Sequence, residues 1–430
     1  MSNIFMENLN INPWKYYYKL TQFYYNLYLL LTKSYFYGPD YKQISLFLRD
    51  NGPVFIKIGQ NLMNKPLIAE DFRNELKTLG NENFHNATIS IDDIKLDTSP
   101  IAAGSIAQVW KGTLNNKTII LKKLHDNIRE DTVLSIKLFE NMKTHFSNYR
   151  WFSYADSLIE FDEVYSGLIN QLDFQNEINN LNKFEEIFKD FSNKIILPTI
   201  INYTDEYIIE SYEVGLRFNE FIEIHKEHKD EVSNLIHCCF YLMFFSNFMH
   251  GDLHESNFLL RLHDIHGVQI VLLDFGIVSQ FNSNETFLKF ISLFRKNVFF
   301  PDQRKIISFL KDVNINQDAE SSIFVNVAHD FLNSLDYENK MKIMMKGKWD
   351  PTDRSLDVGI IFQQILDFAL QYKMKFQGSI LNVCNGFLLI DDYRNQCTGN
   401  TTTWQNKIKY AKDNGFYKVF EDQVKKLFDD

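Results

Sequence analysis

The chain has 430 residues, a length that suits two or three average domains or one two-lobed enzyme, and it can bury a core without disulfides or metals. Hydrophobic residues make up 45% of it and charged residues 23%, and an aromatic share of 15% excludes a disordered chain. Its 45 basic and 55 acidic residues give a net charge of −10, which argues against nucleic acid as a partner bound mainly through phosphate contacts.

The first predicted element is a helix from Trp14 to Phe36 that is crowded with tyrosine and carries Lys15, Lys19 and Lys33. A helix of this kind can lie on a membrane surface or pack against its own domain. No stretch supplies the roughly 20 apolar residues that span a bilayer, and the N-terminus lacks the pattern of a signal peptide. We therefore expect a protein that is cytoplasmic or peripheral to a membrane. Packing of this helix against its own domain is the favoured interpretation, and lipid contact through it is the alternative.

The rest of residues 1–90 is predicted to be helical. Glycine-proline and lysine-proline steps mark the breaks between helices, because proline disfavours a helical residue before it. The predicted helices are Asp40–Leu48, Pro53–Met63 and Ile68–Leu79.

From Ile91 the sequence changes to short apolar runs separated by turn residues. Gly104, then Gly112 with Asn115-Asn116, bound these runs, a pattern that predicts a β-meander. The predicted strands are Ile101–Ala103, Ala107–Trp110 and Thr118–Leu124.

The second half of the chain alternates between long helical patterns and a few strands. A helical stretch is predicted over Asp131–Asp190, strands over Lys194–Ile200, Glu206–Tyr212, Phe258–Leu260 and Val268–Leu273, and mostly helix beyond Phe218. Strands followed by helices indicate an α+β fold. We expect a helical N-terminal extension (1–90), a mixed lobe (91–215) and a mostly helical lobe (216–430).

The most informative segment is His250-Gly-Asp-Leu-His-Glu-Ser-Asn257, followed by Leu272-Leu-Asp-Phe-Gly276. Phosphoryl transfer needs a carboxylate near the attacking hydroxyl and metal ions that bridge the phosphates, and an H-x-D-x4-N loop followed by D-F-G supplies both. Asp252 is the candidate catalytic carboxylate. Asn257 and Asp274 offer the oxygen ligands that Mg²⁺ prefers. ATP and Mg²⁺ are therefore the expected cofactors.

The histidines of this segment allow a second interpretation, in which His250 and His254 bind zinc with Asp252. That interpretation lacks a third histidine or cysteine at the spacing of a zinc site. We expect His250 to orient the loop instead.

A turn of small residues, Ala102-Ala103-Gly104-Ser105, is the candidate phosphate-binding loop, because small side chains let backbone N–H groups approach a phosphate. The next strand ends in Lys122 and Lys123. Strand alternation sends these two side chains to opposite faces, so only one can reach the nucleotide, and we assign Lys122.

Lys122 needs a carboxylate partner from the long helical stretch. Glu177 is the candidate, and Glu163, Glu185 and Glu186 are alternatives that spacing alone does not exclude.

Taken together, these motifs resemble the UbiB/ADCK family of atypical protein-kinase-like proteins, which is implicated in ubiquinone biology. The resemblance runs from about Gly38 to Val278. Its most specific element is the K-x-G-Q motif, present here as Lys57-Ile-Gly59-Gln60. The family implies a two-lobed protein-kinase-like fold in which this helix covers the active site, facing an E-x-D pair.

Three departures from the family pattern stand out. The E-x-D pair reads Gln171-Leu172-Asp173, so Asp173 is the one remaining acidic partner for Lys57. Glu255-Ser256 replaces Pro-Gly in the catalytic loop, and Gly104 stands where the family usually has alanine.

The sequence thus predicts an ATP-dependent atypical kinase or ATPase with an unknown phosphate acceptor and a link to lipid or quinone biology. One alternative is a small-molecule phosphotransferase of the aminoglycoside or choline kinase type, which uses a similar H-G-D-x-H-x-x-N loop. The other is a non-catalytic pseudokinase that binds nucleotide or lipid.

Overall fold

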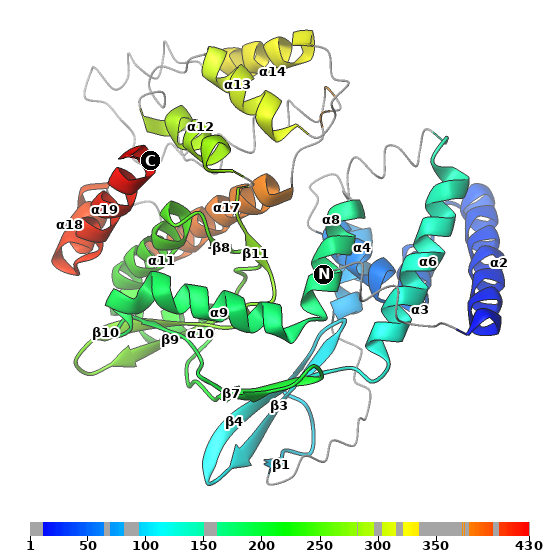
Figure 1. The fold of residues 1–430 in the computed structure, drawn as a ribbon, viewed down its shortest axis with the longest axis horizontal. Helices are drawn as coiled ribbons and strands as arrows, with labels where there is room; N and C mark the ends of the chain where they lie inside the picture. The colour runs from blue at the N-terminus through cyan, green and yellow to red at the C-terminus, as the bar shows by residue number, and fades with distance from the viewer. Residues whose placement is uncertain are drawn as a thin grey trace. The chain divides into compact units, whose positions relative to one another are not determined.

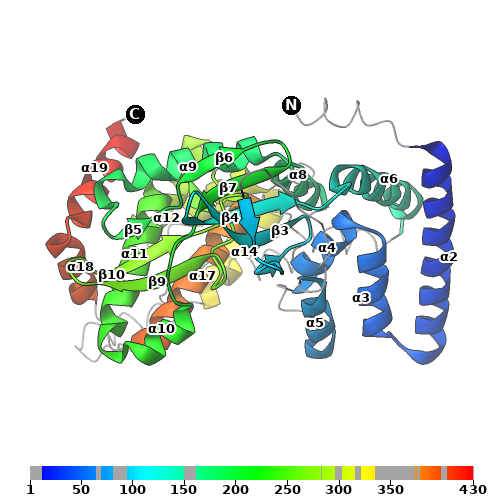
Figure 2. The ribbon, with the colours of Figure 1, turned by 90° about the horizontal axis from the view of Figure 1, so that it is seen from below.

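The computed structural model describes residues 12–63, 69–80, 94–149, 161–281, 283–295, 303–314, 321–334, 372, 374, 378–398 and 404–429. The chain divides into two compact units, residues 1–179 with 198–212 and residues 180–197 with 213–430. Figures 1 and 2 show the elements of each unit.

The first unit begins with helices α2 (Pro13–Tyr37), α3 (Tyr41–Asp50), α4 (Pro53–Met63), α5 (Glu70–Leu76) and the short η1 (Lys77–Gly80). The Asn12 side chain accepts the Trp14 N–H at 3.0 Å and starts α2, and Asp40 accepts the Gln43 N–H at 3.1 Å and starts α3. The predicted helices of this region are therefore present with nearly the expected bounds, because polar caps and proline fix where they begin.

The same unit holds a six-stranded sheet. The strands are β1 (Ile94–Leu96), β2 (Ala102–Ala103), β3 (Ala107–Leu114), β4 (Lys117–Leu124), β6 (Ile200–Tyr203) and β7 (Tyr207–Ser211). They pair in the order β1-β3-β4-β7-β6, with β2 on β3, and every pair is antiparallel.

The strand predicted over Ala107–Trp110 is longer than expected, because it does not end at Gly112. The sequence placed a boundary there, but β3 runs through Gly112 and turns at Asn115 and Asn116, both of which have positive φ. A Cβ on Gly112 would lie 2.9 Å from the Lys95 carbonyl oxygen, so this glycine allows β1 to approach rather than the chain to turn.

The helices of the first unit share one aromatic core. Helices α6 (Ile128–Phe146) and α8 (Phe161–Gln171) complete it, and α9 (Phe174–Phe188) follows. Ring centroids lie 5.4 Å apart between Phe23 and Phe55, 6.0 Å between Phe55 and Phe139, and 4.7 Å between Phe139 and Phe161. These contacts tie α2, α4, α6 and α8 together, and both ribbon views show α2 beside α3 and α6 (Figures 1 and 2).

Two predicted stretches divide differently from expectation. The helical stretch predicted over Asp131–Asp190 breaks between α8 and α9, where Asp173 accepts the Gln175 N–H at 3.0 Å and starts a new helix. The strand predicted over Lys194–Ile200 is two strands, β5 (Ile195–Ile196) and β6, because Pro198 lies between them and cannot donate to a ladder.

The second unit combines small sheets with helices. Its strands are β5, β8 (Met249–His250), β9 (Phe258–His263), β10 (Gly267–Leu272) and β11 (Val278–Ser279); β10 pairs with β5 and β9, and β11 with β8. Its helices are α10 (Phe218–Ile224), α11 (Lys229–Phe245), α12 (Asn284–Arg295), α13 (Gln303–Val313), α14 (Ser321–Ser334), α17 (Gly378–Thr398), α18 (Trp404–Asp413) and α19 (Phe416–Asp429), with short η2 (Lys189–Phe191) and η3 (Lys226–His228).

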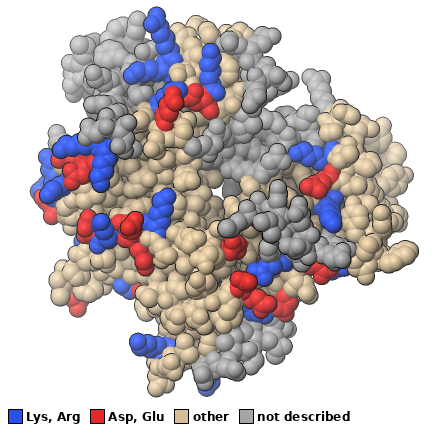
Figure 3. All heavy atoms as spheres, viewed as in Figure 1, with Lys and Arg blue, Asp and Glu red and all other residues tan. Residues whose placement is uncertain are grey.

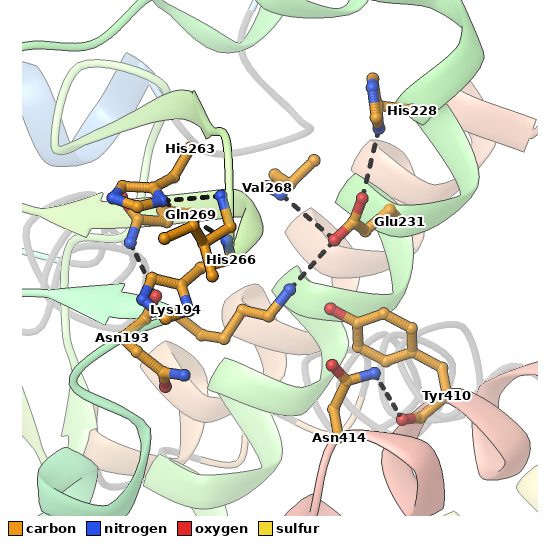
Figure 4. Close-up of polar contacts among 11 residues, drawn as sticks. Asn193, Lys194, His228, Glu231, His263, His266, Val268, Gln269, Tyr410 and Asn414 are labelled. Carbon is orange, nitrogen blue, oxygen red and sulfur yellow. Dashed lines mark hydrogen bonds and ion pairs between the residues drawn. The ribbon is translucent and has the colours of Figure 1, made fainter.

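Helix α11 is the centre of the second unit, and α17, α18 and α19 pack against it. At its first turn Glu231 accepts hydrogen bonds from the Lys194 ammonium and the Val268 N–H, both at 3.1 Å, and contacts His228 at 3.2 Å. Figure 4 shows these contacts converging on the Glu231 carboxylate. This carboxylate therefore joins α11 to β10 and to the segment that leads into β5.

Candidate active site

The candidate nucleotide-binding residues of the first unit centre on Lys122, near the end of β4. Its ammonium donates to both carboxylate oxygens of Glu177, at 2.8 and 2.9 Å, and the two side chains are only 15% and 10% exposed. Lys123 contacts Asp126 instead, at 2.8 Å. The structure thus brings Lys122 together with the glutamate favoured from the sequence, and strand alternation separates the two lysines.

The Ala102–Ser105 loop is held at its turn by three hydrogen bonds. The Gly104 N–H donates to the Ala107 carbonyl at 2.8 Å, the His125 N–H donates to the Ile106 carbonyl at 2.9 Å, and the His125 ring Nε2 lies 2.9 Å from the Gly104 carbonyl oxygen. His125 was missed in the sequence, although it follows β4 directly. Its position after a strand that carries the candidate lysine was the available signal.

The candidate catalytic loop, residues 250–257, belongs to the second unit, and hydrogen bonds within the loop hold it together. His250 accepts the Asp252 N–H at its Nδ1 (3.2 Å), so its Nε2 donates to the Leu273 carbonyl at 3.0 Å. The Asn257 amide donates to the Asp252 carbonyl at 2.8 Å. Burial lowers the pKa of His250, so this side chain is neutral and orients the loop, as expected from the sequence.

His254 lies beside the candidate catalytic carboxylate. Its Nε2 is 3.4 Å from Asp252 Oδ2, and this contact raises the pKa of His254. The Asp252 side chain is 44% exposed and thus open to a reacting group.

Asp274 has a left-handed backbone, with φ +59°. Few residues other than glycine adopt this conformation, and those that do often lie at functional sites. The Gly276 N–H donates to Asp274 Oδ1 at 3.2 Å, and Asn180 of α9 donates to the Phe275 carbonyl at 2.8 Å. Asn180, also missed in the sequence, therefore helps to hold the D-F-G turn.

The two candidate metal ligands suit a hard cation. The Leu273 N–H donates to the Asn257 carbonyl at 2.8 Å, which holds the residue before Asp274 against Asn257. The side-chain amide nitrogen of Asn257 donates to Asp252. The side-chain oxygen Oδ1 of Asn257 therefore remains as the candidate ligand atom. Among the described residues, no group of three or more His, Cys, Asp or Glu side chains could hold a metal ion.

The K-x-G-Q motif lies on α4, in the middle of the first unit's helices. Gly59 is required there, because a Cβ would lie 2.4 Å from the Leu79 side chain in the core. Lys57 and Gln60 are half-buried, whereas Asp173 is exposed and caps α9. Within the described side chains, no hydrogen bond or ion pair joins Lys57 to Asp173. The side chain of Glu163, which the sequence offered as an alternative to Glu177 for pairing with Lys122, lies outside the described residues.

Comparison with known proteins gives the family of this chain. The model of the ABC1 atypical kinase-like domain matches residues 83–310, more than half of the chain. The probable serine/threonine-protein kinase abkC of Dictyostelium discoideum is 28% identical over 237 residues, which cover 50% of this chain and 34% of that protein. The ABC1 family protein MCP2 of Saccharomyces cerevisiae is 27% identical over 305 residues, 61% of this chain and 52% of that protein.

Other matches cover more of the chain. An uncharacterized protein of Clostridium pasteurianum is 24% identical over 406 residues, 86% of this chain and 71% of that protein. Among solved structures, the Mycobacterium tuberculosis Rv3197–erythromycin complex matches with a TM-score of 0.42 and 16% identity, covering 72% of this chain and 79% of that one. The family match confirms the UbiB/ADCK resemblance and the α+β, protein-kinase-like fold class expected from the sequence. The chain belongs to the family of ABC1 atypical kinase-like proteins.

Proposed function

We propose that this chain binds ATP with Mg²⁺ and transfers or hydrolyses the terminal phosphate. The observation that carries the proposal is the ion pair between Lys122 and Glu177. The Lys122 ammonium lies within 2.9 Å of both carboxylate oxygens of Glu177, and both side chains are largely buried. A buried lysine fixed in this way is the group that orients the α- and β-phosphates in kinases. The Ala102–Ser105 loop supplies backbone N–H groups near phosphate.

The second unit carries its own candidate groups. Asp252 accepts the proton of the attacking hydroxyl or water, and His254 beside it stabilises its charge. Asn257 and Asp274 would hold Mg²⁺, which when bound offsets the negative charge of the phosphates. His250 keeps the loop in place by its contact with Leu273.

The proposal is tested by following labelled γ-phosphate from ATP with the purified protein, with and without anionic vesicles and candidate acceptors. We expect label to leave ATP, and Asp252→Asn to abolish this without changing the melting temperature. Asp264→Asn, an exposed acid in the β9–β10 turn, is the matched control. Equal phosphate release by wild type and Asp252→Asn would contradict the proposal.

The destination of the label separates the alternatives. Label on protein indicates a protein kinase, label on a small molecule a phosphotransferase, and inorganic phosphate an ATPase. MgATP binding without any turnover would identify a pseudokinase.

We further infer that α2 meets an anionic membrane surface. Among the described residues, α2 carries half of the large apolar side chains that are exposed; they are Trp14, Tyr17, Tyr18, Tyr25, Tyr28, Leu29, Leu31, Tyr35, Phe36 and Tyr37. The helix has three lysines and no acidic residue, within a chain of net charge −10. Figure 3 shows few charged side chains over α2, at the right edge of the view. Tyrosine and tryptophan with lysine suit the interface of an anionic bilayer.

Sedimentation with phosphatidylglycerol vesicles tests this contact. We expect wild type to sediment with anionic vesicles and less with neutral ones, and the triple variant Tyr25→Ser, Tyr28→Ser, Phe36→Ser to stay in the supernatant. Ile265→Ser, which removes an 82% exposed side chain elsewhere, is the control. Loss of a dimer, rather than of vesicle binding, in the triple variant would assign the face to a second copy. None of the helices in the described part of the chain combines the length and the hydrophobicity that a transmembrane span requires.

We also propose that Lys57, Gln60 and Asp173 regulate access to the nucleotide site, a role that rests on the family's K-x-G-Q motif. The half-buried position of Lys57 and Gln60 on α4 supports a specific role rather than a solvent-exposed one. We propose in the same way that the family's link to lipid or quinone biology extends to this chain.

A further inference from the structure

In the catalytic loop, Glu255 and Ser256 occupy the two positions that the H-x-D-x-H-x-x-N pattern leaves open, where related proteins have proline and glycine. Gly251 and Ser256 restrict the backbone little, so the loop needs contacts with other parts of the chain to keep one conformation. The internal bonds described above join His250, Asp252 and Asn257 but do not involve the Glu255 side chain.

Glu255 is instead held by the first turn of α10 and by Arg217, the residue before that helix. The Asn219 amide nitrogen donates to both carboxylate oxygens of Glu255, at 3.1 and 3.0 Å, and the Arg217 guanidinium donates to the Glu255 carbonyl at 3.2 Å. These contacts cross 36 and 38 positions of sequence, so they fix tertiary structure and do not arise from a local turn. Both donors lie on the same short piece of chain.

The two chain segments that carry these contacts pack closely against each other. Leu216 and Leu260 exchange backbone hydrogen bonds of 2.8 and 2.9 Å, and a Cβ on Gly215 would lie 2.7 Å from the Leu259 Cβ, so the two chains touch closely. Beneath them Tyr393 packs on Phe218 and Phe258, with ring centroids 4.7 and 5.3 Å apart. Residues 215–219 thus run along residues 255–260 from a packed core outward to Glu255.

We propose that Asn219 and Glu255 form a clamp that positions the catalytic loop, so that Asp252 and Asn257 keep their geometry without a stiffer residue at position 255. The effect of the clamp on catalysis rests on the proposed function, whereas its effect on the conformation of the loop does not. Asn219 and Glu255 are positioning residues that act through the loop. Charge-assisted hydrogen bonds are stronger than neutral ones, which makes a carboxylate and an amide a suitable pair.

The test is an isosteric swap. Asn219→Asp sets two carboxylates against each other, whereas Asn219→Asp with Glu255→Gln restores a donor facing an acceptor with the positions exchanged. We expect Asn219→Asp to speed hydrogen exchange of the amides of residues 253–257 and to lower kcat about tenfold, with KM for ATP unchanged, because a small displacement of reacting groups is costly. The double variant should recover both. Glu223→Gln, an exposed change on the same helix, is the control and should alter neither.

The exchange measurement separates the two claims. If wild type turns over no ATP, the proposed function fails, and faster exchange in Asn219→Asp with recovery in the double variant still supports the clamp. The clamp would be overturned if the amides of residues 253–257 exchanged at the wild-type rate in Asn219→Asp, or if they exchanged equally fast in Glu223→Gln. Either result would count whether or not the protein turns over ATP.

Discussion

At the scale of single residues, the placement of Lys122 depends on one feature of β4, which is the alternation of its side chains. Lys122 lies opposite Val109 and Ile208 in the sheet and contacts Glu177, whereas Lys123, one position on, contacts Asp126. The two lysines are adjacent and alike in chemistry, so they form a matched pair for testing the assignment.

Lys122→Ala should weaken ATP binding much more than Lys123→Ala. The first change removes the proposed phosphate contact and the ion pair with the largely buried Glu177 carboxylate, whereas the second removes an ion pair with the exposed Asp126, worth at most about 1 kcal/mol. Titration with a fluorescent ATP analogue measures both affinities. Similar losses in the two variants would show that the assignment of faces is wrong.

Gly104 and Gly112 make a second matched pair, because both lie in or beside β3 and differ in the room around them. A Cβ on Gly104 would have its nearest neighbour at 3.8 Å, whereas a Cβ on Gly112 would meet the Lys95 carbonyl oxygen at 2.9 Å. Gly112→Ala should lower the free energy of unfolding by about 1–3 kcal/mol, and Gly104→Ala should change it by about 1 kcal/mol or less.

Gly104→Ala should nevertheless change ATP affinity, because the added Cβ restricts the loop that approaches phosphate. Urea unfolding and ATP binding, measured on both variants, check the two statements. Unchanged ATP affinity in Gly104→Ala would remove the phosphate-binding role of the loop.

At the scale of elements, α18 is joined to α11 by a buried histidine. His237 Nδ1 lies 2.7 Å from the Ser233 carbonyl, so this nitrogen carries the proton, and Nε2 accepts a hydrogen bond of 2.9 Å from the Lys407 ammonium. Burial, together with the charge of Lys407, lowers the pKa of His237 to about 3. The folded state therefore needs the neutral ring.

Acid should weaken this junction in a defined range. Because the folded pKa of about 3 lies below the ordinary value of 6.5, the contribution is fully present above pH 6.5 and is lost as the pH falls toward 3. The slope from this group is at most about 1.4 kcal/mol per pH unit. The variant His237→Gln does not titrate, so its free energy of unfolding should fall less steeply over this range. Parallel curves for the two proteins would contradict the role of His237.

Helix α4 allows a prediction about the K-x-G-Q motif. Since no described contact joins Lys57 to Asp173, Lys57→Ala should change the free energy of unfolding by only about 0.5 kcal/mol. We expect the same variant to change nucleotide preference or the rate of phosphate transfer, if α4 regulates the site. Lys42→Ala, on α3, is the control. Unchanged nucleotide preference together with an unchanged rate of phosphate transfer in Lys57→Ala would contradict the regulatory role.

The sequence predicted most elements because their ends are marked by local chemistry. Pro53 starts α4, Asp40 caps α3, and the Asn115-Asn116 turn separates β3 from β4. It could not predict what depends on distant neighbours. Gly112 reads as a turn residue until β1 is seen against it, and a continuous apolar run hides the assignment of β5 to a different sheet from β6.

At the scale of the whole molecule, the candidate site was largely predictable because its chemistry resides in ordered motifs. Asp252, Asn257 and Asp274 follow from the loop and D-F-G patterns, and the structure adds the supporting groups that carry no motif. His125, Asn180 and Asn219 are such groups; each donates across a gap in sequence to a backbone or carboxylate oxygen, and single polar residues of this kind are common everywhere in a chain.

The most direct test of MgATP binding is the melting temperature of wild type and Asp274→Asn with and without MgATP. Asparagine tolerates the left-handed backbone of position 274 and removes only the charge, so the unliganded variant should melt like wild type. We predict that MgATP raises the melting temperature of wild type and leaves that of Asp274→Asn nearly unchanged. An equal rise in both proteins would contradict the assignment of Asp274 to the metal, and no rise in wild type would contradict MgATP binding itself.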